Sequence, residues 1–131
     1  MEIAKKDIKE QIEKMLDSEN NYVYKLALEN MLEVVDMYSN DDDMINSDTL
    51  LEDSLYYIDN DYRSTSYYSS EVLHYEKDFN EICNSTYSND YLQEIIDDDT
   101  SLFNGVEEVL SDMYGYCMKV ATYTLINRLF N

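Results

Sequence analysis

Carboxylate side chains recur at helical spacing in two parts of the chain. Residues three and four apart on a helix have Cβ atoms about 5–6 Å from each other, and one strand of duplex DNA carries a charge about every 3.4 Å. Rows of carboxylates on helices, continued by two runs of three aspartates, are therefore able to imitate a phosphate backbone. The two rows are Glu29, Glu33 and Asp36, and Glu94, Asp97 and Asp98.

Residues 39–62 combine acids with tyrosines: eight acidic side chains, no lysine and no arginine. Carboxylates pair with the guanidinium fork of arginine, and aromatic rings stack on its plane. The stretch therefore fits a partner surface rich in arginine. The candidate partner-binding residues are the aromatic Tyr56, Tyr57 and Tyr62 and the acids Glu29, Glu33, Asp36, Asp41, Asp42, Asp43, Asp48, Glu52, Asp53, Asp59, Asp61, Glu94, Asp97, Asp98, Asp99, Glu107 and Glu108.

The negative charge of the chain is gathered in blocks. Of a net charge of −20, residues 26–62 contribute eleven acids and no base, and residues 78–118 contribute ten acids and no base. A surface that serves solubility alone usually intersperses both signs. The charge also disfavours binding to nucleic acid or to an anionic membrane. The two interpretations left are a solvated acidic surface and a surface that faces a basic partner.

The residue types that carry enzyme chemistry are scarce. The single histidine, His74, falls inside a predicted helix, where a lone histidine is usually a surface or partly buried structural residue. The sequence has no G-x-S-x-G, no phosphate-cradling glycine loop and no H-E-x-x-H. We therefore expect no catalytic residue, no enzymatic activity and no cofactor.

Two acidic stretches partly match the calcium-binding loop of an EF-hand. Residues 97–108 fit it at positions 1, 3, 5 and 12, and residues 41–52 fit it at positions 1, 3 and 12. Position 6 requires glycine because the loop turns sharply there. The first stretch has Leu102 at that position and the second has Asn46. We expect no calcium site.

The two cysteines, Cys83 and Cys117, are open to two interpretations. They are able to pair, but a cytosolic chain normally keeps its thiols reduced, and cysteine is among the most often buried residue types. We interpret both as buried small apolar residues. With His74 they supply at most three soft ligands and no C-x-x-C spacing, so no zinc site is expected either.

The elements that must position these side chains are predicted to be helices. The chain has no proline and two glycines, which suits helices and suits barrels or sandwiches poorly. Apolar periodicity predicts six of them, and "SNDDDMINSD" reads as a loop. They run from Ile3 to Leu16, from a cap at Ser18 or Asn20 to Tyr38, from a cap at Ser47 or Asp48 to Ile58, from about Ser69 to Cys83, from Tyr91 to Ile96, and from a cap at Thr100 or Ser101 to Leu129.

The predicted fold class is all-α, a single compact acidic domain over residues 1–131 with five or six helices and a long C-terminal helix. In that helix we expect a buried stripe that includes Tyr116 and Cys117. Residues 1–16 carry charges where a signal peptide has an apolar core, and no run of about 18 apolar residues would span a membrane. We expect a location in the cytoplasm of a host cell.

A 16-residue segment resembles a motif of small uncharacterised proteins encoded by phages and mobile elements. The segment is "YYSSEVLHYEKDFNEI", residues 67–82, and that group carries a pattern similar to Y-Y-S-D-T-x-x-F-Y-x-K-H-x-x-E-I. The flanking "ALENMLE" and "YGYCMKVATYTLINRL" look similar to helices of the same group. The departures are Ser70, Glu71, His74 and Asp78; the matches are Tyr67, Tyr68, Ser69, Tyr75, Lys77, Glu81 and Ile82.

The resemblance implies a phage or mobile-element context, and with the charge pattern it favours an anti-defence function. The expected partner is a basic DNA-binding protein of the host, above all a type II CRISPR effector whose DNA or PAM groove an acidic DNA mimic would occupy. Two alternatives stay open. One is antirestriction, or inhibition of a DNA-repair glycosylase, by the same mimicry. The other is a structural or adaptor phage protein whose acidity confers only solubility.

Overall fold

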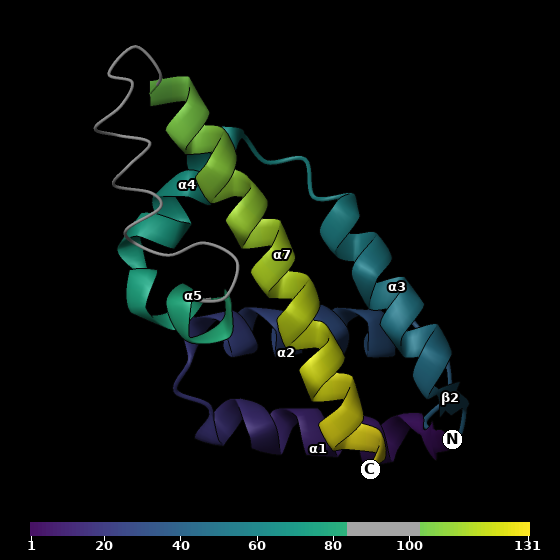
Figure 1. The fold of residues 1–131 in the computed structure, drawn as a ribbon. Helices are drawn as coiled ribbons and strands as arrows, with labels where there is room; N and C mark the ends of the chain where they lie inside the picture. Colours follow the sequence, from purple (N-terminus) through teal and green to yellow (C-terminus); the bar gives the residue numbers. More distant parts are fainter. Residues whose placement is uncertain (84–102) are drawn as a thin grey trace. The chain divides into compact units, whose positions relative to one another are not determined.

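Helices account for most of the chain in a computed structural model that describes residues 1–83 and 103–131 (Figure 1). Within these residues there are six helices, a long C-terminal helix among them, and one two-stranded antiparallel sheet, so the predicted all-α class is confirmed. The elements are β1 (Glu2–Ala4), α1 (Lys5–Ser18), α2 (Tyr22–Asp36), β2 (Met44–Asn46), α3 (Ser47–Asp59), α4 (Thr65–His74), α5 (Glu76–Cys83) and α7 (Phe103–Phe130). The predicted helix at Tyr91–Ile96 and the cap at Thr100 or Ser101 lie outside the described residues.

The chain forms two compact units. Unit 1 consists of residues 1–61 and 118–131, and unit 2 of residues 62–117. Unit 1 therefore contains α1, α2, α3, the sheet and the last part of α7. Unit 2 contains α4, α5 and the first part of α7. No helix in the described part of the chain is both long and apolar enough to cross a membrane.

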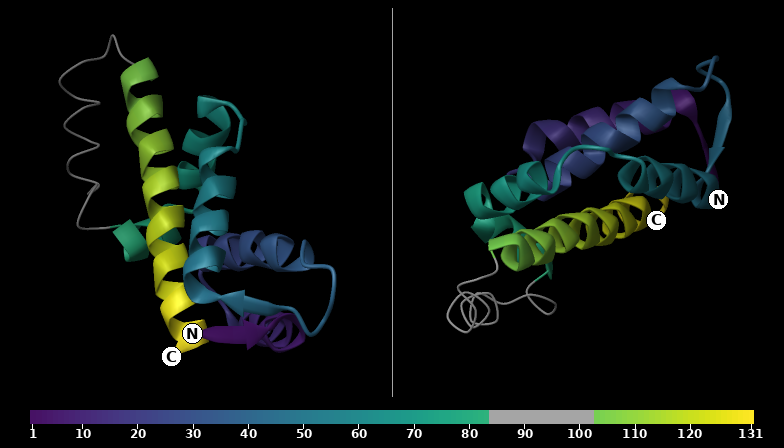
Figure 2. Two further views of the ribbon diagram at one scale, coloured as in Figure 1. Left: turned by 90° about the vertical axis from the view of Figure 1, so that its right-hand side faces the viewer. Right: turned by 90° about the horizontal axis from the view of Figure 1, so that it is seen from above.

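In unit 1, α1 and α2 lie side by side (Figures 1 and 2), and α3 also packs against α2. Each helix buries an apolar stripe, because its apolar residues recur three and four positions apart. Burial of each valine, leucine, isoleucine, methionine or phenylalanine side chain stabilises the unit by about 1.5–3 kcal/mol. The stripes are Ile8 and Ile12 of α1, Val23, Ala27, Leu28, Met31, Val34 and Val35 of α2, Leu50 of α3, and Ala121, Leu125, Ile126, Leu129 and Phe130 of α7.

Asparagine side chains cap the starts of α2 and α3. Asn21 Oδ1 accepts hydrogen bonds from the N–H of Val23 at 2.8 Å and of Tyr24 at 3.3 Å. Asn46 Oδ1 caps α3 in the same way, with the N–H of Asp48 at 2.8 Å. These bonds satisfy amides that have no partner within their own helix. The predicted caps at Ser18 or Asn20 and at Ser47 or Asp48 are therefore wrong by one to three residues.

The sheet corrects two further predictions. β1 pairs with β2 in antiparallel register, with Ile3 opposite Ile45. Ile3 was expected in a helix and belongs to a strand, and the segment expected to be a loop, residues 39–48, contains the strand β2. Ile45 is fully buried. A strand of three residues carries too little periodicity to be seen in the sequence, and its partner lies about 40 positions away. The sheet fixes the C-terminal end of the segment between α2 and β2.

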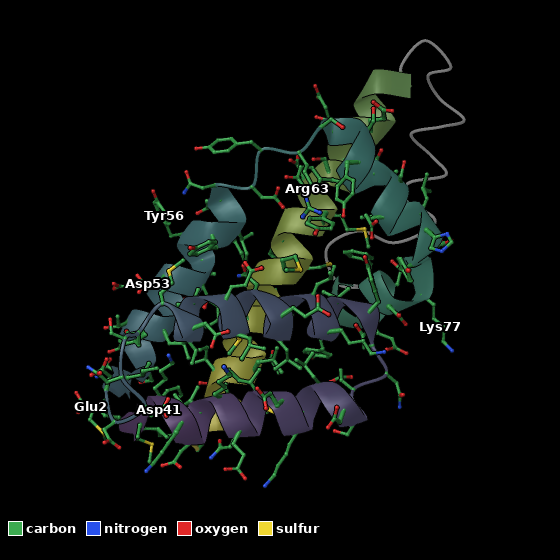
Figure 3. All side chains as sticks on the ribbon, turned by 180° about the vertical axis from the view of Figure 1, so that it is seen from behind. Glu2, Asp41, Asp53, Tyr56, Arg63 and Lys77 are labelled. Carbon is green, nitrogen blue, oxygen red and sulfur yellow. The ribbon has the colours of Figure 1, made fainter. Side chains whose placement is uncertain are left out.

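The start of α1 is satisfied by that same segment. Ala4 stands at the N-cap without a side-chain hydrogen bond. Instead, the N–H of Lys5 donates to the carbonyl oxygen of Asp43 at 2.8 Å, and the N–H of Lys6 donates to that of Asp41 at 3.0 Å. The N-terminal end of a helix carries a partial positive charge. The aspartate run, residues 41–43, therefore lies where negative charge is stabilised. Figure 3 shows Asp41 beside this end of α1.

Unit 2 has a break that the sequence did not predict. The expected helix over residues 69–83 is two helices, because Tyr75 adopts φ −112° and ψ 37° between α4 and α5. Tyr114, on α7, is buried against the aromatic residues of these helices, with ring centroids 4.8 Å from Tyr68 and 5.6 Å from Phe79. Tyr116, expected in the core, is 45% exposed. The buried stripe of α7 thus runs through Tyr114 and not Tyr116.

Cys117 is buried, as predicted, but it is not a reduced thiol. It is fully buried, and its Sγ lies 3.6 Å from the carbonyl oxygen of Phe79. It is also disulfide-bonded. The expectation of a reduced thiol at this residue is therefore wrong in the structure. The side chain of Cys83 lies outside the described part.

Candidate functional site

The predicted carboxylate row on α2 lies on the solvent-facing side of that helix. Glu29, Glu33 and Asp36 are all exposed. They share one face because steps of four and three residues advance a helix by about one turn. The opposite face of α2 is the buried apolar stripe, so the core of unit 1 fixes the direction in which the row points.

The exposed face of α3 is acidic along its whole length. Asp48, Glu52, Asp53 and Asp59 are exposed there, and α3 contains neither lysine nor arginine. Tyr56 lies among them with 65% of its surface exposed. Figure 3 shows Asp53 and Tyr56 one turn apart on this helix. The predicted combination of carboxylates with an accessible ring is therefore present on α3.

The aspartate run precedes β2, and its own backbone carbonyl groups bind it to the start of α1. Asp41 and Asp42 are exposed, and Asp43 is half-buried. Besides the carbonyl bonds to α1, a carboxylate oxygen of Asp43 accepts a hydrogen bond from the N–H of Asn40 at 3.1 Å. The carboxylates of Asp41 and Asp42 are exposed, and that of Asp42 lies 3.6 Å from the ammonium of Lys6.

Lysines of the same chain neutralise three of the candidate acids in part. Salt bridges join Lys9 to Asp36 at 2.9 Å, Lys6 to Asp42 at 3.6 Å and Lys119 to Asp59 at 2.7 Å. The hydrogen bond to Asp36, with the charge of that carboxylate, raises the pKa of Lys9. All six groups are substantially exposed, so solvent screens each pair and its contribution to stability is small. Unit 1 still has seventeen acids against seven lysines and arginines, a net charge of −10.

A groove lies between the C-terminal end of α2 and the outer side of α3. It has a volume of about 590 Å³ and is lined mainly by apolar and aromatic surface. Two carboxylates, Asp43 and Asp53, stand on its walls. Neither forms an ion pair with a lysine or arginine in residues 1–83 or 103–131. The other lining residues are Val34, Met37, Tyr38, Ser39, Tyr56 and Tyr57.

The hydroxyl groups in this groove act as hydrogen-bond donors. The Tyr57 hydroxyl donates to the sulfur of Met37 at 3.2 Å. Burial raises the pKa of Tyr38, and the carboxylates of Asp53 and Asp43 raise it further. The groove therefore holds a neutral phenol beside two acids, and that local field favours positive charge.

The end of α2 adds to this field. The C-terminal end of a helix carries a partial negative charge of about half an electron, and α2 has no basic residue in its last turn. The nearest compensation is the ammonium of Lys5, which donates to the carbonyl oxygen of Tyr38. The helix end and the two carboxylates thus act in the same direction on whatever occupies the groove.

The remaining candidate partner-binding residues lie at the end of unit 1, in unit 2 or outside the described residues. Asp61 is half-buried at the end of unit 1. In unit 2, Tyr62 is 87% exposed, Glu108 is exposed, and Glu107 accepts a hydrogen bond from the Ser66 hydroxyl at 3.3 Å. Outside the described residues lie Glu94, Asp97, Asp98 and Asp99.

Other chemistry finds little support in the described residues. His74 is exposed at the end of α4, and its ring meets that of Tyr75 edge-on with centroids 4.6 Å apart. Across residues 1–83 and 103–131, no three histidine, cysteine or acidic side chains are grouped so as to hold a metal ion. One of the two partial calcium loops, residues 97–108, lies outside these ranges in its first half, residues 97–102.

Comparisons with known proteins give no relative: no family model, no curated protein and no solved structure matches the chain. The site therefore has to be interpreted from its own residues. Of the groove lining, the sequence pointed to Asp43, Asp53, Tyr56 and Tyr57. It missed Val34, Met37, Tyr38 and Ser39. The available signal was Tyr38 itself, a ring with a polar tip that lies at the end of an apolar stripe, three residues before Asp41.

Proposed function

We propose that the chain is a phage-type protein inhibitor of a DNA-binding host-defence nuclease, above all a type II CRISPR effector, in the cytoplasm of the host. It acts as an acidic DNA mimic that occupies the basic DNA or PAM groove. Nucleases of this kind hold DNA through lysine and arginine and read a PAM with arginines in the major groove. The chain inhibits by competing with DNA for those side chains.

The observation that carries the proposal is the continuous acidic exposure of unit 1. The outer faces of α2 and α3 and the loop between them present carboxylates, while the apolar residues of the same helices are buried. The core holds these acids in fixed positions, which a flexible acidic tail does not do. The phage-like motif at residues 67–82, on α4 and α5, supports the anti-defence context.

Two alternatives follow from the same surface. Restriction enzymes and DNA-repair glycosylases also hold DNA in basic grooves, so an acidic mimic fits them by the same chemistry. An adaptor or structural phage protein would use the acids only for solubility. The three intramolecular salt bridges favour that last alternative locally, because they show some of the acids already paired.

The test is displacement of DNA from purified nucleases. We expect the chain to release DNA from a type II CRISPR effector complex in a mobility-shift assay, and to do so more weakly as salt is raised. Release from a restriction enzyme or a glycosylase instead would assign the target to the first alternative. No release from any of the three, with the chain in excess, would leave only the adaptor function.

A matched pair of triple variants separates a specific face from overall charge. Asp41, Asp42 and Asp43 changed to asparagine should weaken inhibition visibly, although each exposed charge contributes about 0–1 kcal/mol. The control changes Glu2, Glu13 and Asp17 to their amides: all three are exposed, belong to unit 1 and stand in no salt bridge found in the described chain. Equal loss in both variants would contradict a contact at the aspartate run.

A further inference from the structure

We propose that the groove between α2 and α3 binds an arginine side chain, with its flanking backbone, from a loop of the basic protein partner. The inference rests on the proposed function for the nature of the partner, and it names the side chain that the partner inserts. In this groove, defined above by eight lining residues, three tyrosines share one concave surface with two carboxylates that have no lysine or arginine partner in the described residues.

Charge complementarity selects a cation. Asp43 and Asp53 approach the groove from different elements, the loop before β2 and α3, so a bound cation meets acids on two sides. The C-terminal end of α2 contributes further negative potential, which the Lys5 ammonium on the Tyr38 carbonyl oxygen offsets in part. Three tyrosines line the same space, and a cation over an aromatic face is attracted by the ring quadrupole. An anion would be repelled by the two carboxylates, and a neutral ligand would gain nothing from their charge.

The apolar lining selects guanidinium over ammonium. Val34 and Met37 form part of the wall, so a bound group loses water on that side. A lysine ammonium is strongly hydrated, while a guanidinium is weakly hydrated, planar and able to stack on rings. Its five donors also reach two carboxylates at once, which a compact ammonium does less well.

The chain itself shows this packing in both units. In unit 2 the guanidinium carbon of Arg63 lies 4.1 Å from the ring centroid of Tyr67, and in unit 1 that of Arg128 lies 5.2 Å from that of Tyr24. Tyrosine surfaces of this protein thus already accept guanidinium groups. The groove offers the same kind of surface with two acids and without an arginine of its own among its lining residues.

Size selects a side chain presented on a peptide segment. A volume of about 590 Å³ falls within the range of small-molecule sites, about 300–1,000 Å³, and exceeds what one side chain fills. Met37 and Tyr56, at the rim, are 61% and 65% exposed. Both are therefore accessible to the backbone that flanks an inserted arginine.

The experiment uses short peptides, so that it does not depend on any nuclease. The full chain, labelled with ¹⁵N, is titrated at low ionic strength with acetyl-Gly-Arg-Gly-amide and, in parallel, with acetyl-Gly-Lys-Gly-amide. We expect the arginine peptide to bind several-fold more tightly, with amide shifts concentrated in residues 34–43 and 53–57. Equal binding of both peptides, or shifts spread over all acidic segments, would overturn the proposal.

Two neighbouring variants locate the site. D53N removes a carboxylate of the groove, and E52Q removes the same charge from the adjacent, exposed position outside it. We expect D53N to weaken binding of the arginine peptide about fivefold or more, and E52Q by less than about twofold. Equal losses would show only the attraction of the overall charge and would refute the groove.

The peptide result is independent of the proposed function. If the arginine peptide binds in the groove but no nuclease is inhibited, the groove stands and the proposed target is wrong. If nucleases are inhibited and D53N behaves like E52Q in both assays, the mimic stands and the arginine site is wrong.

Discussion

The ammonium of Lys119, on α7, lies 2.7 Å from a carboxylate oxygen of Asp59, the last residue of α3. This pair connects residues 60 positions apart within unit 1 and removes one charge from the acidic face of α3. Its two side chains are 44% and 58% exposed, so solvent screens the attraction strongly. The pair therefore changes the charge of the surface locally and contributes little to the stability of unit 1.

A double-mutant cycle of K119M and D59N measures that pair. We expect a coupling of about 0–1 kcal/mol from urea unfolding, falling toward zero at high salt, because exposed pairs in water are worth little. A coupling that persists at high salt would contradict the exposure of the two groups. K119M alone should also strengthen binding to a basic partner, since it restores a free carboxylate to α3.

Substitution in β2 tests how the acidic loop is anchored. Ile45→Ala should lower the free energy of unfolding by about 2–5 kcal/mol, because Ile45 is fully buried and the change leaves a cavity. The control is Met44→Ala on the same strand, where the side chain is 53% exposed and a change of less than about 0.5 kcal/mol is expected. Similar effects of the two changes would show that the strand does not bury one face.

Tyr38 should be identifiable in an alkaline titration. Its pKa is raised, first by burial and then by Asp53 and Asp43. The tyrosinate absorbance that wild type gains over Tyr38→Phe should therefore appear with a midpoint above the ordinary tyrosine pKa of about 10. D53N should move that difference toward lower pH. A difference centred at or below the ordinary value would contradict the contact with the two carboxylates.

The same shift has a consequence for stability. The folded state keeps the proton of Tyr38 more tightly than the unfolded chain does. The contribution to stability is therefore complete below a pH of about 10 and is lost as pH rises through the folded-state pKa. Unfolding measured between neutral and strongly alkaline pH should show a steeper decline in wild type than in Tyr38→Phe. An identical decline would mean that other groups dominate.

Cys117 gives a redox test. In the unfolded, unreduced chain, iodoacetamide should fail to modify Cys117, because this residue is disulfide-bonded. Cys117→Ser should then lower the free energy of unfolding by about 2–5 kcal/mol under oxidising conditions, and by much less when reductant is present. Alkylation of Cys117 without prior reduction would restore the interpretation of a reduced, buried thiol and support a reducing compartment.

The helices were predictable because their signals are local. Apolar residues three and four apart, in a chain without proline, located α1, α2, α3 and α7 to within a few residues. The strand at Ile3 was not predictable, because its pairing with Ile45 depends on residues far along the chain. The break at Tyr75 also lacked a signal, since neither glycine nor proline stands there. In α7, the sequence placed Tyr116 inside, but packing buries Tyr114.

The acids of the candidate site were predictable as a set, and their grouping was not. Net charge and spacing identified Asp43 and Asp53, yet nothing in the sequence says that they line one groove. That relationship depends on where α2 ends and on how the loop returns to pair with the start of the chain. The sequence placed Tyr38 at the end of a predicted helix, and its place in the groove wall follows from its position just after α2.

Unit 1 is assembled from two separated stretches, residues 1–61 and 118–131, with unit 2 inserted between them. Its core includes Leu125 and Leu129, which the ribosome adds after all of unit 2. During synthesis at about 5–20 residues per second, α1, α2 and α3 are therefore exposed for several seconds before their last packing partner emerges. A fragment of residues 1–61 presents the acidic face on an incomplete core. Expression of the intact chain, and not of its acidic half, is thus required to obtain the surface in its native shape.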